Sequence, residues 1–329
     1  MHVPLGPGAE FDRIRRFLAS ARTGDPKYVR VGPGDDAAII EAGRLAISTD
    51  MSVENVHFRR EWLTPPEIGA RATMVALSDQ AACAALPFGV LVSLAVAADE
   101  PADMMASIMD GVRAAAEGQG AVLIGGDLTR SPGPIVIDVI TLGSVERAVL
   151  RSGARTGDTV WVTGRLGAAA AAVSDLGRGR TPDAGARVAY ASPMARTREA
   201  RWLAEHELPT AMIDLSDGLA SDAAHIAAAS GRRIVIEAAE LPVHDVAASR
   251  GSEEGFRLAL AGGDDYELCF TAPAGAVEDA RSDFQAAFAV PLTRVGTVEE
   301  GRGVMLRESG GELVPMPVAG FDHFARGQA

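Results

Sequence analysis

Short apolar runs alternate with segments of helical periodicity through the first half of the chain. The apolar runs predict β-strands at residues 44–48, 90–97, 121–124 and 135–145. A helix is predicted to start after Thr64, because Thr-Pro-Pro-Glu provides a hydroxyl N-cap, a proline at the first helical position and Glu67 at the third. A second helix is predicted over residues 102–117, with Gly118 ending it. The pattern therefore predicts a mixed α/β first lobe.

A second lobe is indicated near residue 150, where a turn-rich segment precedes a new strand and helix. The expected elements are a strand at 159–164, a helix opening after Gly167, a helix at 216–230, a strand at 266–271 and a hairpin at 303–316. Residues 178–195, rich in Arg, Gly, Pro and Ala, predict a surface connection. A chain of 329 residues is long for one core. We therefore expect a two-domain α/β (α+β) protein with domains at residues 1–149 and 150–329.

Composition narrows the functional class. With 47% hydrophobic and 23% charged residues the chain is expected to be globular, and a net charge of −13 argues against nucleic acid or an anionic membrane as partner. Cys83 and Cys269 lie in apolar runs, which predicts buried, reduced thiols. The N-terminal segment has no apolar signal core and no run of 18 apolar residues occurs, so a cytoplasmic location is expected.

Lysine chemistry is nearly excluded, because the 31 basic residues comprise 30 arginines and the single Lys27. A phosphate-binding loop of the G-x-x-x-x-G-K-[ST] type is therefore absent. If the protein binds phosphates, it must do so by other groups.

Aspartates follow apolar runs in five places, in VGPGDDAAII, LAISTDMSV, VLIGGDLTR, AMIDLSDGL and LALAGGDDYE. Turns at the carboxyl ends of neighbouring strands lie close together, so these acids are expected to gather around one cleft. They are Asp35, Asp36, Asp50, Asp127, Asp214, Asp217, Asp264 and Asp265. Oxygen-only ligands favour Mg²⁺. Ordinary turn chemistry explains each motif taken singly.

Asp79 strengthens the metal hypothesis because it lies inside the first predicted helix, on a stripe with Ala72, Val75, Ala76 and Cys83. A carboxylate on a core-facing stripe must find hydrogen bonds or a metal ion. Both outcomes are open from sequence.

The paired glycines before Asp127 and Asp264 would let the backbone approach a polyphosphate. Mg²⁺ could then join carboxylates to phosphates, with Arg151 supplying positive charge, although Arg151 could equally be a solvated turn residue. The motifs alone favour a structural role for His57, because a lone histidine is more often a surface or core group than a catalyst. Neither cysteine has a neighbouring group that would make it a nucleophile.

Taken in order, the motifs resemble the thiamine-monophosphate kinase family over essentially the whole chain. They are GPGDDAAII, AISTDMSVENVHF, ALSDQAACAALP, LIGGDLTR, RSGARTGDTVWVTG, IDLSDGLASD, GGDDYELCF and GFDHF. That family is part of a superfamily of ATP-dependent enzymes that includes aminoimidazole ribonucleotide synthetase, selenophosphate synthetase and a hydrogenase-maturation dehydratase.

The resemblance implies transfer of the ATP γ-phosphoryl group to thiamine monophosphate, directly and in line, with several Mg²⁺ ions and without an assigned acid or base. It also implies a homodimer whose N-terminal halves share a β-barrel, each C-terminal half forming a sandwich-like α/β domain. The implied metal ligands are Asp36, Ser48, Thr49, Asp50, Asp79, Asp127, Asp214 and Asp217. The implied ATP contacts are Gly126, Asp127, Arg151 and Ser216, and the implied thiamine phosphate contacts are His57, Asp264 and Phe321.

Two positions depart from the common family pattern: Asp264 stands where glutamate is frequent, and Phe321 where tyrosine or tryptophan is frequent. A carboxylate and an aromatic face remain a reasonable cradle for the thiazolium cation. Two alternatives stay open, namely another ATP-dependent synthetase or dehydratase of the superfamily and a non-catalytic, metal-stabilised dimer.

Overall fold

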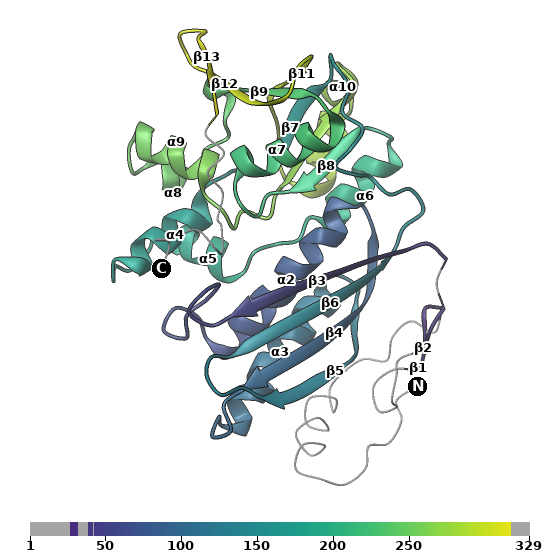
Figure 1. Ribbon diagram of the computed structural model, residues 1–329, viewed down its shortest axis with the longest axis vertical. Helices are drawn as coiled ribbons and strands as arrows, with labels where there is room; N and C mark the ends of the chain where they lie inside the picture. The colour runs from purple at the N-terminus through teal and green to yellow at the C-terminus, as the bar shows by residue number, and fades with distance from the viewer. Residues whose placement is uncertain (1–26, 32–38, 42, 317–329) are drawn as a thin grey trace. The chain divides into compact units, whose positions relative to one another are not determined.

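The computed structural model describes residues 27–31, 39–41 and 43–316, which form two compact units (Figure 1). Unit 1 comprises residues 1–80 and 85–146, and unit 2 comprises residues 81–84 and 147–329. The change of unit at Glu146 and Arg147 lies close to the domain boundary expected from the sequence.

Unit 1 is built on a four-stranded sheet of order β3-β6-β4-β5, in which only β4 and β5 run parallel. Its strands are β3 (Leu45–Val53), β4 (Leu86–Val96), β5 (Val122–Arg130) and β6 (Val136–Ser144), and β1 (Val29–Val31) pairs separately with β2 (Ile39–Ile40). Helices α2 (Pro65–Ala82) and α3 (Ala102–Gly118) both lie on one face of the sheet (Figure 1). In this strand order, β3 and β5 are the two edge strands of the sheet.

Local sequence signals explain where α2 begins and where α3 ends. The Thr64 amide donates to Glu67 Oε2 at 2.8 Å, which confirms the reciprocal half of the predicted capping box. The helix α3 ends at Gly118, close to the predicted position. The two helices approach so closely that a Cβ on Gly69 would lie 1.9 Å from the Ile108 carbonyl oxygen, and one on Gly111 would lie 1.9 Å from that of Pro66.

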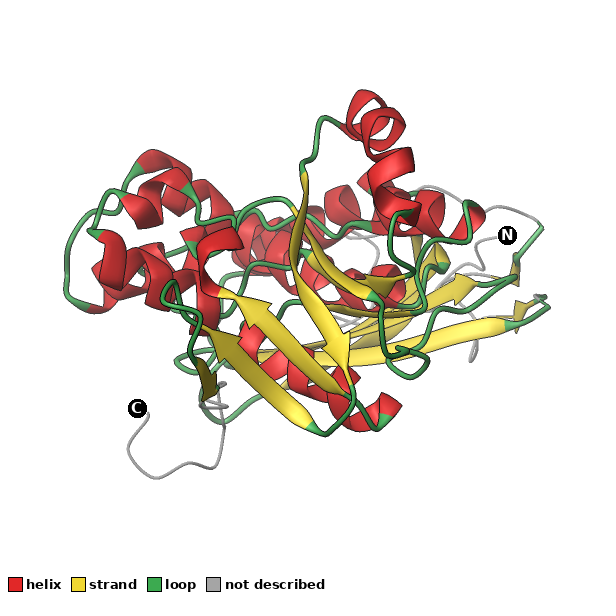
Figure 2. Ribbon diagram, turned by 90° about the horizontal axis from the view of Figure 1, so that it is seen from above, coloured by secondary structure: helices red, strands yellow, loops and turns green. Residues whose placement is uncertain are grey.

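Unit 2 contains a seven-stranded sheet of order β13-β12-β9-β11-β7-β10-β8. Its strands are β7 (Thr159–Thr163), β8 (Ala211–Asp214), β9 (Arg233–Glu237), β10 (Leu268–Ala272), β11 (Leu292–Glu299), β12 (Gly303–Arg307) and β13 (Leu313–Pro315). The helices are α4 (Ala168–Gly177), α5 (Ala184–Ala191), α6 (Thr197–Glu205), α7 (Leu219–Ser230), the 3₁₀ helix η1 (Ala238–Glu240), α8 (Asp245–Ala248), α9 (Ser252–Ala261) and α10 (Ala276–Phe288). The mixture of helices and strands in the molecule is visible in Figure 2.

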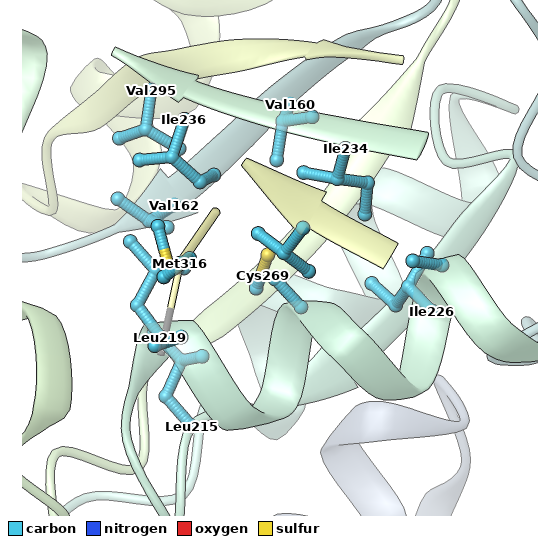
Figure 3. Close-up of a cluster of buried hydrophobic side chains, with 14 of the residues drawn as sticks. Val160, Val162, Leu215, Leu219, Ile226, Ile234, Ile236, Cys269, Val295 and Met316 are labelled. Atoms are coloured by element: carbon cyan, nitrogen blue, oxygen red, sulfur yellow. The ribbon is translucent and has the colours of Figure 1, made fainter. Parts of the chain in front are cut away.

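Alternate residues of the central strands of unit 2 belong to different cores, so both faces of the sheet are buried. Val160, Val162 and Cys269 pack with Leu219 and Ile226 of α7 on one face (Figure 3). The intervening residues contribute to a second cluster, which contains Trp161, Met212, Leu268, Phe270 and Phe284. This two-sided burial is why these strands read as continuous apolar runs in the sequence.

The structure corrects several predictions from the sequence. Residues 178–195 are not only a surface connection, because α5 forms within them: Asp183 accepts from the Gly185 amide at 2.8 Å, and Ala186, Tyr190 and Ala191 are buried along one side. The helix expected at 216–230 begins only at Leu219. Cys83 is half-buried rather than buried, whereas Cys269 is buried as expected.

The predicted strands at 44–48 and 121–124 continue to Val53 and Arg130, which places Asp50 and Asp127 inside strands and not in turns after them. The apolar run before Gly262 is the end of the helix α9 and not a strand. The two edge strands extend through polar residues that have no apolar pattern, because the main chain of β3 pairs with β6 and that of β5 pairs with β4. Among the described helices, none is long and apolar enough to cross a membrane.

Candidate functional site

The strand β3 presents two different sets of polar groups on its two faces. Ser48 and Asp50 are half-buried on the side covered by α2, and Ser48 Oγ donates a hydrogen bond to Asp79 Oδ2 of that helix. Thr49 points to the other face, where its hydroxyl donates to Asp138 Oδ1 of β6 at 2.7 Å. Asp79 has thus found the hydrogen bond that a carboxylate on an inward-facing stripe requires. Side chains of consecutive residues 48–50 cannot all act on one face of the sheet.

The Gly125-Gly126-Asp127 motif lies in β5, on the opposite edge of the sheet. A Cβ on Gly126 would lie 2.0 Å from the Val92 carbonyl oxygen, so glycine is needed there for the approach of β5 to β4. Asp127 is exposed and pairs across the strands with Ser93, which pairs in turn with Asp138. Three strand spacings of ~4.8 Å put roughly 14 Å between the β3 and β5 edges. Within unit 1, the structure therefore does not bring Asp127 together with Asp50.

The Asp214-Leu-Ser-Asp217 segment of unit 2 connects β8 to α7 and does place acids close together. Asp222 in the first turns of α7 is only 2% exposed, and its Oδ2 accepts from the Asp217 amide at 3.1 Å. Burial, followed by the charges of Asp214 and Asp217, raises the pKa of Asp222 to about 8. Asp222 was not singled out from the sequence, although it lies on the apolar face of α7 with Leu219 and Ile226, just as Asp79 lies on an apolar stripe.

The loop from Gly262 to Glu267 lies against the Asp214–Asp217 segment. The Asp264 amide donates to the Ser216 carbonyl at 2.9 Å, and the Tyr266 amide donates to that of Leu215 at 2.8 Å. A Cβ on Gly263 would lie 2.6 Å from the Ser216 carbonyl oxygen, so only glycine permits this contact between the two segments. Ser216 and Asp264, which are predicted to bind different substrates, are therefore held next to each other by a backbone hydrogen bond between their two segments.

Two further acids anchor this loop to the rest of unit 2. Asp265 accepts from the Gly167 amide at 2.9 and 3.0 Å, and burial raises its pKa well above the usual value in spite of these bonds. Glu267 accepts from Thr163 Oγ1 at 2.6 Å and from Arg196 Nε at 2.8 Å. Neither anchor was predicted from the sequence, since both depend on residues about 70 to 100 positions away.

The structure also describes two of the remaining predicted site residues, His57 and Arg151. His57 Nδ1 accepts from the Val53 amide at 3.0 Å, so a neutral imidazole carries its proton on Nε2. Arg151 is exposed, and its carbonyl accepts from Ser230 Oγ at 3.4 Å. Asp35, Asp36 and Phe321 lie outside the described residues.

The predicted metal ligands have the right donor chemistry for Mg²⁺, because all are carboxylate or hydroxyl oxygens. In unit 2, burial and then the charges of Asp214 and Asp217 raise the pKa of Asp222, and a divalent cation beside these two acids would offset the repulsion between the carboxylates. Within residues 27–31, 39–41 and 43–316, however, no group of three or more His, Cys, Asp or Glu side chains could hold a metal ion by itself. Of the described candidates, five belong to unit 1 and two to unit 2.

Comparison with known protein families shows which class of protein has this fold. Residues 34–145 match AIR synthase related protein, N-terminal domain, and residues 155–307 match AIR synthase related protein, C-terminal domain. The two-unit α/β fold is thus that of the AIR synthase related proteins.

More specific relatives identify the family. The chain is 34% identical to thiamine-monophosphate kinase of Escherichia coli (strain K12), over 96% of this chain and 98% of that one. The crystal structure of thiamine-monophosphate kinase from Stenotrophomonas maltophilia K279a superposes with a TM-score of 0.81 at 33% identity, covering 94% and 98% of the two chains. AaThiL complexed with AMPPCP and TMP has a TM-score of 0.76 at 30% identity, covering 95% and 96%. The chain belongs to the thiamine-monophosphate kinase family.

Proposed function

We propose that the protein phosphorylates thiamine monophosphate to thiamine diphosphate with ATP as the donor. The observation that carries the proposal is the match over nearly the full length of both chains to thiamine-monophosphate kinases. A related structure holds AMPPCP and TMP together. The absence of a P-loop lysine agrees with a kinase of this fold, which must bind phosphates by other groups.

Two sets of residues contact the substrates in this proposal. ATP is held by Gly126, Asp127, Arg151 and Ser216, and thiamine phosphate by His57, Asp264 and Phe321. The hydrogen bond of the Asp264 amide to the Ser216 carbonyl supports placing the two substrates next to each other. Asp264 supplies a negative charge for the thiazolium cation.

Several Mg²⁺ ions complete the site in this proposal. The proposed ligands are Asp36, Ser48, Thr49, Asp50, Asp79, Asp127, Asp214 and Asp217, of which Thr49 has its side chain on the face of the sheet opposite to Ser48 and Asp50. When bound, Mg²⁺ would neutralise the polyphosphate charge that this acidic protein otherwise repels. The oxygen-only donor set and the hydrogen bond of Ser48 to Asp79 support the assignment.

Transfer is direct in this mechanism. A phosphate oxygen of thiamine monophosphate forms a bond to the γ-phosphorus while the bond from that phosphorus to the ADP oxygen breaks. No strong base is needed, because a phosphate monoester with a second pKa of about 6 is already an anion at neutral pH. Arg151 and the bound cations offset the repulsion between the two anions. Chiral γ-thiophosphate ATP should therefore give inverted configuration, whereas retention would indicate a phosphoenzyme.

A homodimer sharing a β-barrel between its N-terminal halves is part of the proposal. Two features of unit 1 support it: Ile47 and Met51, on the sheet face away from α2, are 62% and 54% exposed, and β3 and β5 are edge strands. Pairing the β3 edge of one copy with the β5 edge of another would also place Asp127 of one copy beside β3 of the other. The acidic chain has no nucleic-acid or membrane partner in this proposal, and a cytoplasmic location is part of it, since both cysteines lie in apolar runs typical of reduced thiols.

The deciding experiment measures ADP release with and without thiamine monophosphate, with thiamine diphosphate quantified in parallel. A thiamine-monophosphate kinase forms one thiamine diphosphate for each ADP. A superfamily synthetase or dehydratase would release ADP only with another acceptor, and a non-catalytic dimer would release none. ADP release that ignores thiamine monophosphate would contradict the proposal.

A further inference from the structure

The carboxylate of Asp264 is held by a neighbouring side chain in a strained loop. Asp264 and Tyr266 have φ values of 71° and 51°, in the left-handed region that non-glycine residues rarely adopt. The Tyr266 hydroxyl donates to Asp264 Oδ1 at 2.8 Å. Tyr266 is only 5% exposed, so its ring is fixed by its surroundings. A buried phenol therefore orients a partly exposed carboxylate.

Backbone hydrogen bonds along the loop and an ion pair at its C-terminal end hold the strained conformation. The Asp264 and Tyr266 amides donate to the carbonyls of Ser216 and Leu215. Beyond Tyr266, Glu267 is buried in a bidentate ion pair with Arg196 and accepts from Thr163. Strained backbone that is held in this way is typical of residues that must present a group in one orientation.

We propose that Tyr266 is a positioning residue, which holds the Asp264 carboxylate toward the thiazolium cation of thiamine monophosphate. The inference rests on the proposed function, because it assigns Asp264 to that substrate. The phenol hydrogen bond to an ionised carboxylate is charge-assisted and directional. Without it the carboxylate would lose a contact that fixes its orientation, and the substrate would bear a larger part of the entropic cost of ordering it.

The test is a double-mutant cycle on kcat/KM for thiamine monophosphate, using Tyr266→Phe, Asp264→Ala and the double variant. Tyr266→Phe keeps the ring and removes the hydroxyl, so KM for thiamine monophosphate should rise roughly threefold to tenfold with kcat and the KM for ATP nearly unchanged. In the Asp264→Ala background the same change should have no further effect. Tyr190→Phe, which alters another buried tyrosine of unit 2, is the matched control and should leave KM unchanged.

Each outcome decides the point. An unchanged KM in Tyr266→Phe overturns the inference, and so does an equal loss in both backgrounds or a parallel loss of ATP binding, because these indicate a purely structural residue. The thermal shift produced by thiamine monophosphate should follow the KM and provides a readout independent of turnover. A wild-type protein that neither binds nor phosphorylates thiamine monophosphate would instead contradict the proposed function itself.

Discussion

Asp79 and Asp222 show how single carboxylates are accommodated beside apolar residues. Asp79 accepts from Ser48 of β3, and Asp222 accepts from the Asp217 amide. Both lie on helices whose neighbouring positions are largely apolar, where a carboxylate without such partners would be costly. At the scale of the residue, Asp79 and Asp222 thus differ from ordinary surface carboxylates, because each is held by a hydrogen bond within the fold.

Replacement of Asp79 or Asp127 by asparagine should reduce turnover below about one hundredth of the wild type at saturating Mg²⁺, because an amide is a poor substitute for an anionic ligand. The fold should survive, since the amide oxygen introduced by Asp79→Asn can still accept from Ser48. ADP release and circular dichroism check the two expectations. Asp110→Asn, at an exposed position of α3, should be fully active. Near-normal turnover by either variant would rule out a metal-binding role for that residue.

Asp265→Asn should stabilise the protein at high pH. Burial raises the pKa of Asp265 in the folded chain, so the folded state binds the proton more tightly than the unfolded state. Its contribution to stability is therefore greatest below the unfolded pKa and is lost as pH rises through the raised folded pKa. Asparagine cannot ionise, and its oxygen can accept from the Gly167 amide.

Urea unfolding at pH 5 and pH 8 measures this effect. The gain in free energy of unfolding for Asp265→Asn should be larger at pH 8. The control Asp283→Asn, at an exposed position, should show little difference between the two pH values. A gain that is independent of pH would refute the explanation by ionisation.

At the scale of the element, the contact of α2 with α3 depends on two reciprocal glycines. Gly69 faces the Ile108 carbonyl, and Gly111 faces the Pro66 carbonyl, with no space for a methyl group at either. The cost of glycine within a helix is accepted here because it lets two backbones approach. The pair of helices then covers one face of the sheet that carries β3 and β5 (Figure 1).

Gly69→Ala and Gly111→Ala should each lower the free energy of unfolding by about 1–3 kcal/mol or more, since the helices must move apart. Gly118→Ala in the same helix α3 is the control, because no atom lies within 4 Å of the added methyl group. That variant should be neutral or slightly stabilising. Chemical denaturation compares the three, and equal stability of all of them would contradict the close helix contact.

At the scale of the whole molecule, the described ligand candidates of unit 1 lie on opposite edges of one sheet. Ser48, Asp50 and Asp79 belong to the β3 side, and Asp127 belongs to β5. The proposed homodimer resolves this separation by joining the two edges of different copies. Each active site of the proposed homodimer then contains residues of both chains, and a complementation experiment can detect this.

A heterodimer of Asp79→Asn and Asp127→Asn chains, purified through two different tags, should recover about half of the wild-type activity, because one of its two sites receives both intact residues. Each parent homodimer should be inactive. ADP release is again the measurement. A heterodimer as inactive as its parents would show that each site is contained in one chain.

Ile47→Asp should convert the dimer to a monomer, because it places a charge on the apolar sheet face. Sedimentation velocity gives the oligomeric state directly. Val188→Asp is the matched control, since Val188 of unit 2 is 61% exposed and Ile47 is 62% exposed. A wild-type monomer, or an Ile47→Asp variant that remains dimeric, would contradict the proposed interface.

Local signals in the sequence were sufficient for several helix ends and for the family. The capping box at Thr64 and the glycines at Gly118 and Gly231 determine where helices begin or end through hydrogen bonds with adjacent residues. The ordered acidic motifs likewise identified the family that the comparisons confirm. Such features are readable because their physical causes lie within a few positions of one another.

Only the tertiary structure decided where the acids lie. Asp50 and Asp127 are inside strands because the backbone of β3 and β5 pairs with β6 and β4, which no pattern of neighbouring side chains reveals. Strand order then separates these residues across the sheet. The orientation of Asp264 similarly depends on anchors distant in sequence, such as Arg196. Register and strand order arise from pairing between remote segments, and the free energy of that pairing is not encoded in any one segment alone.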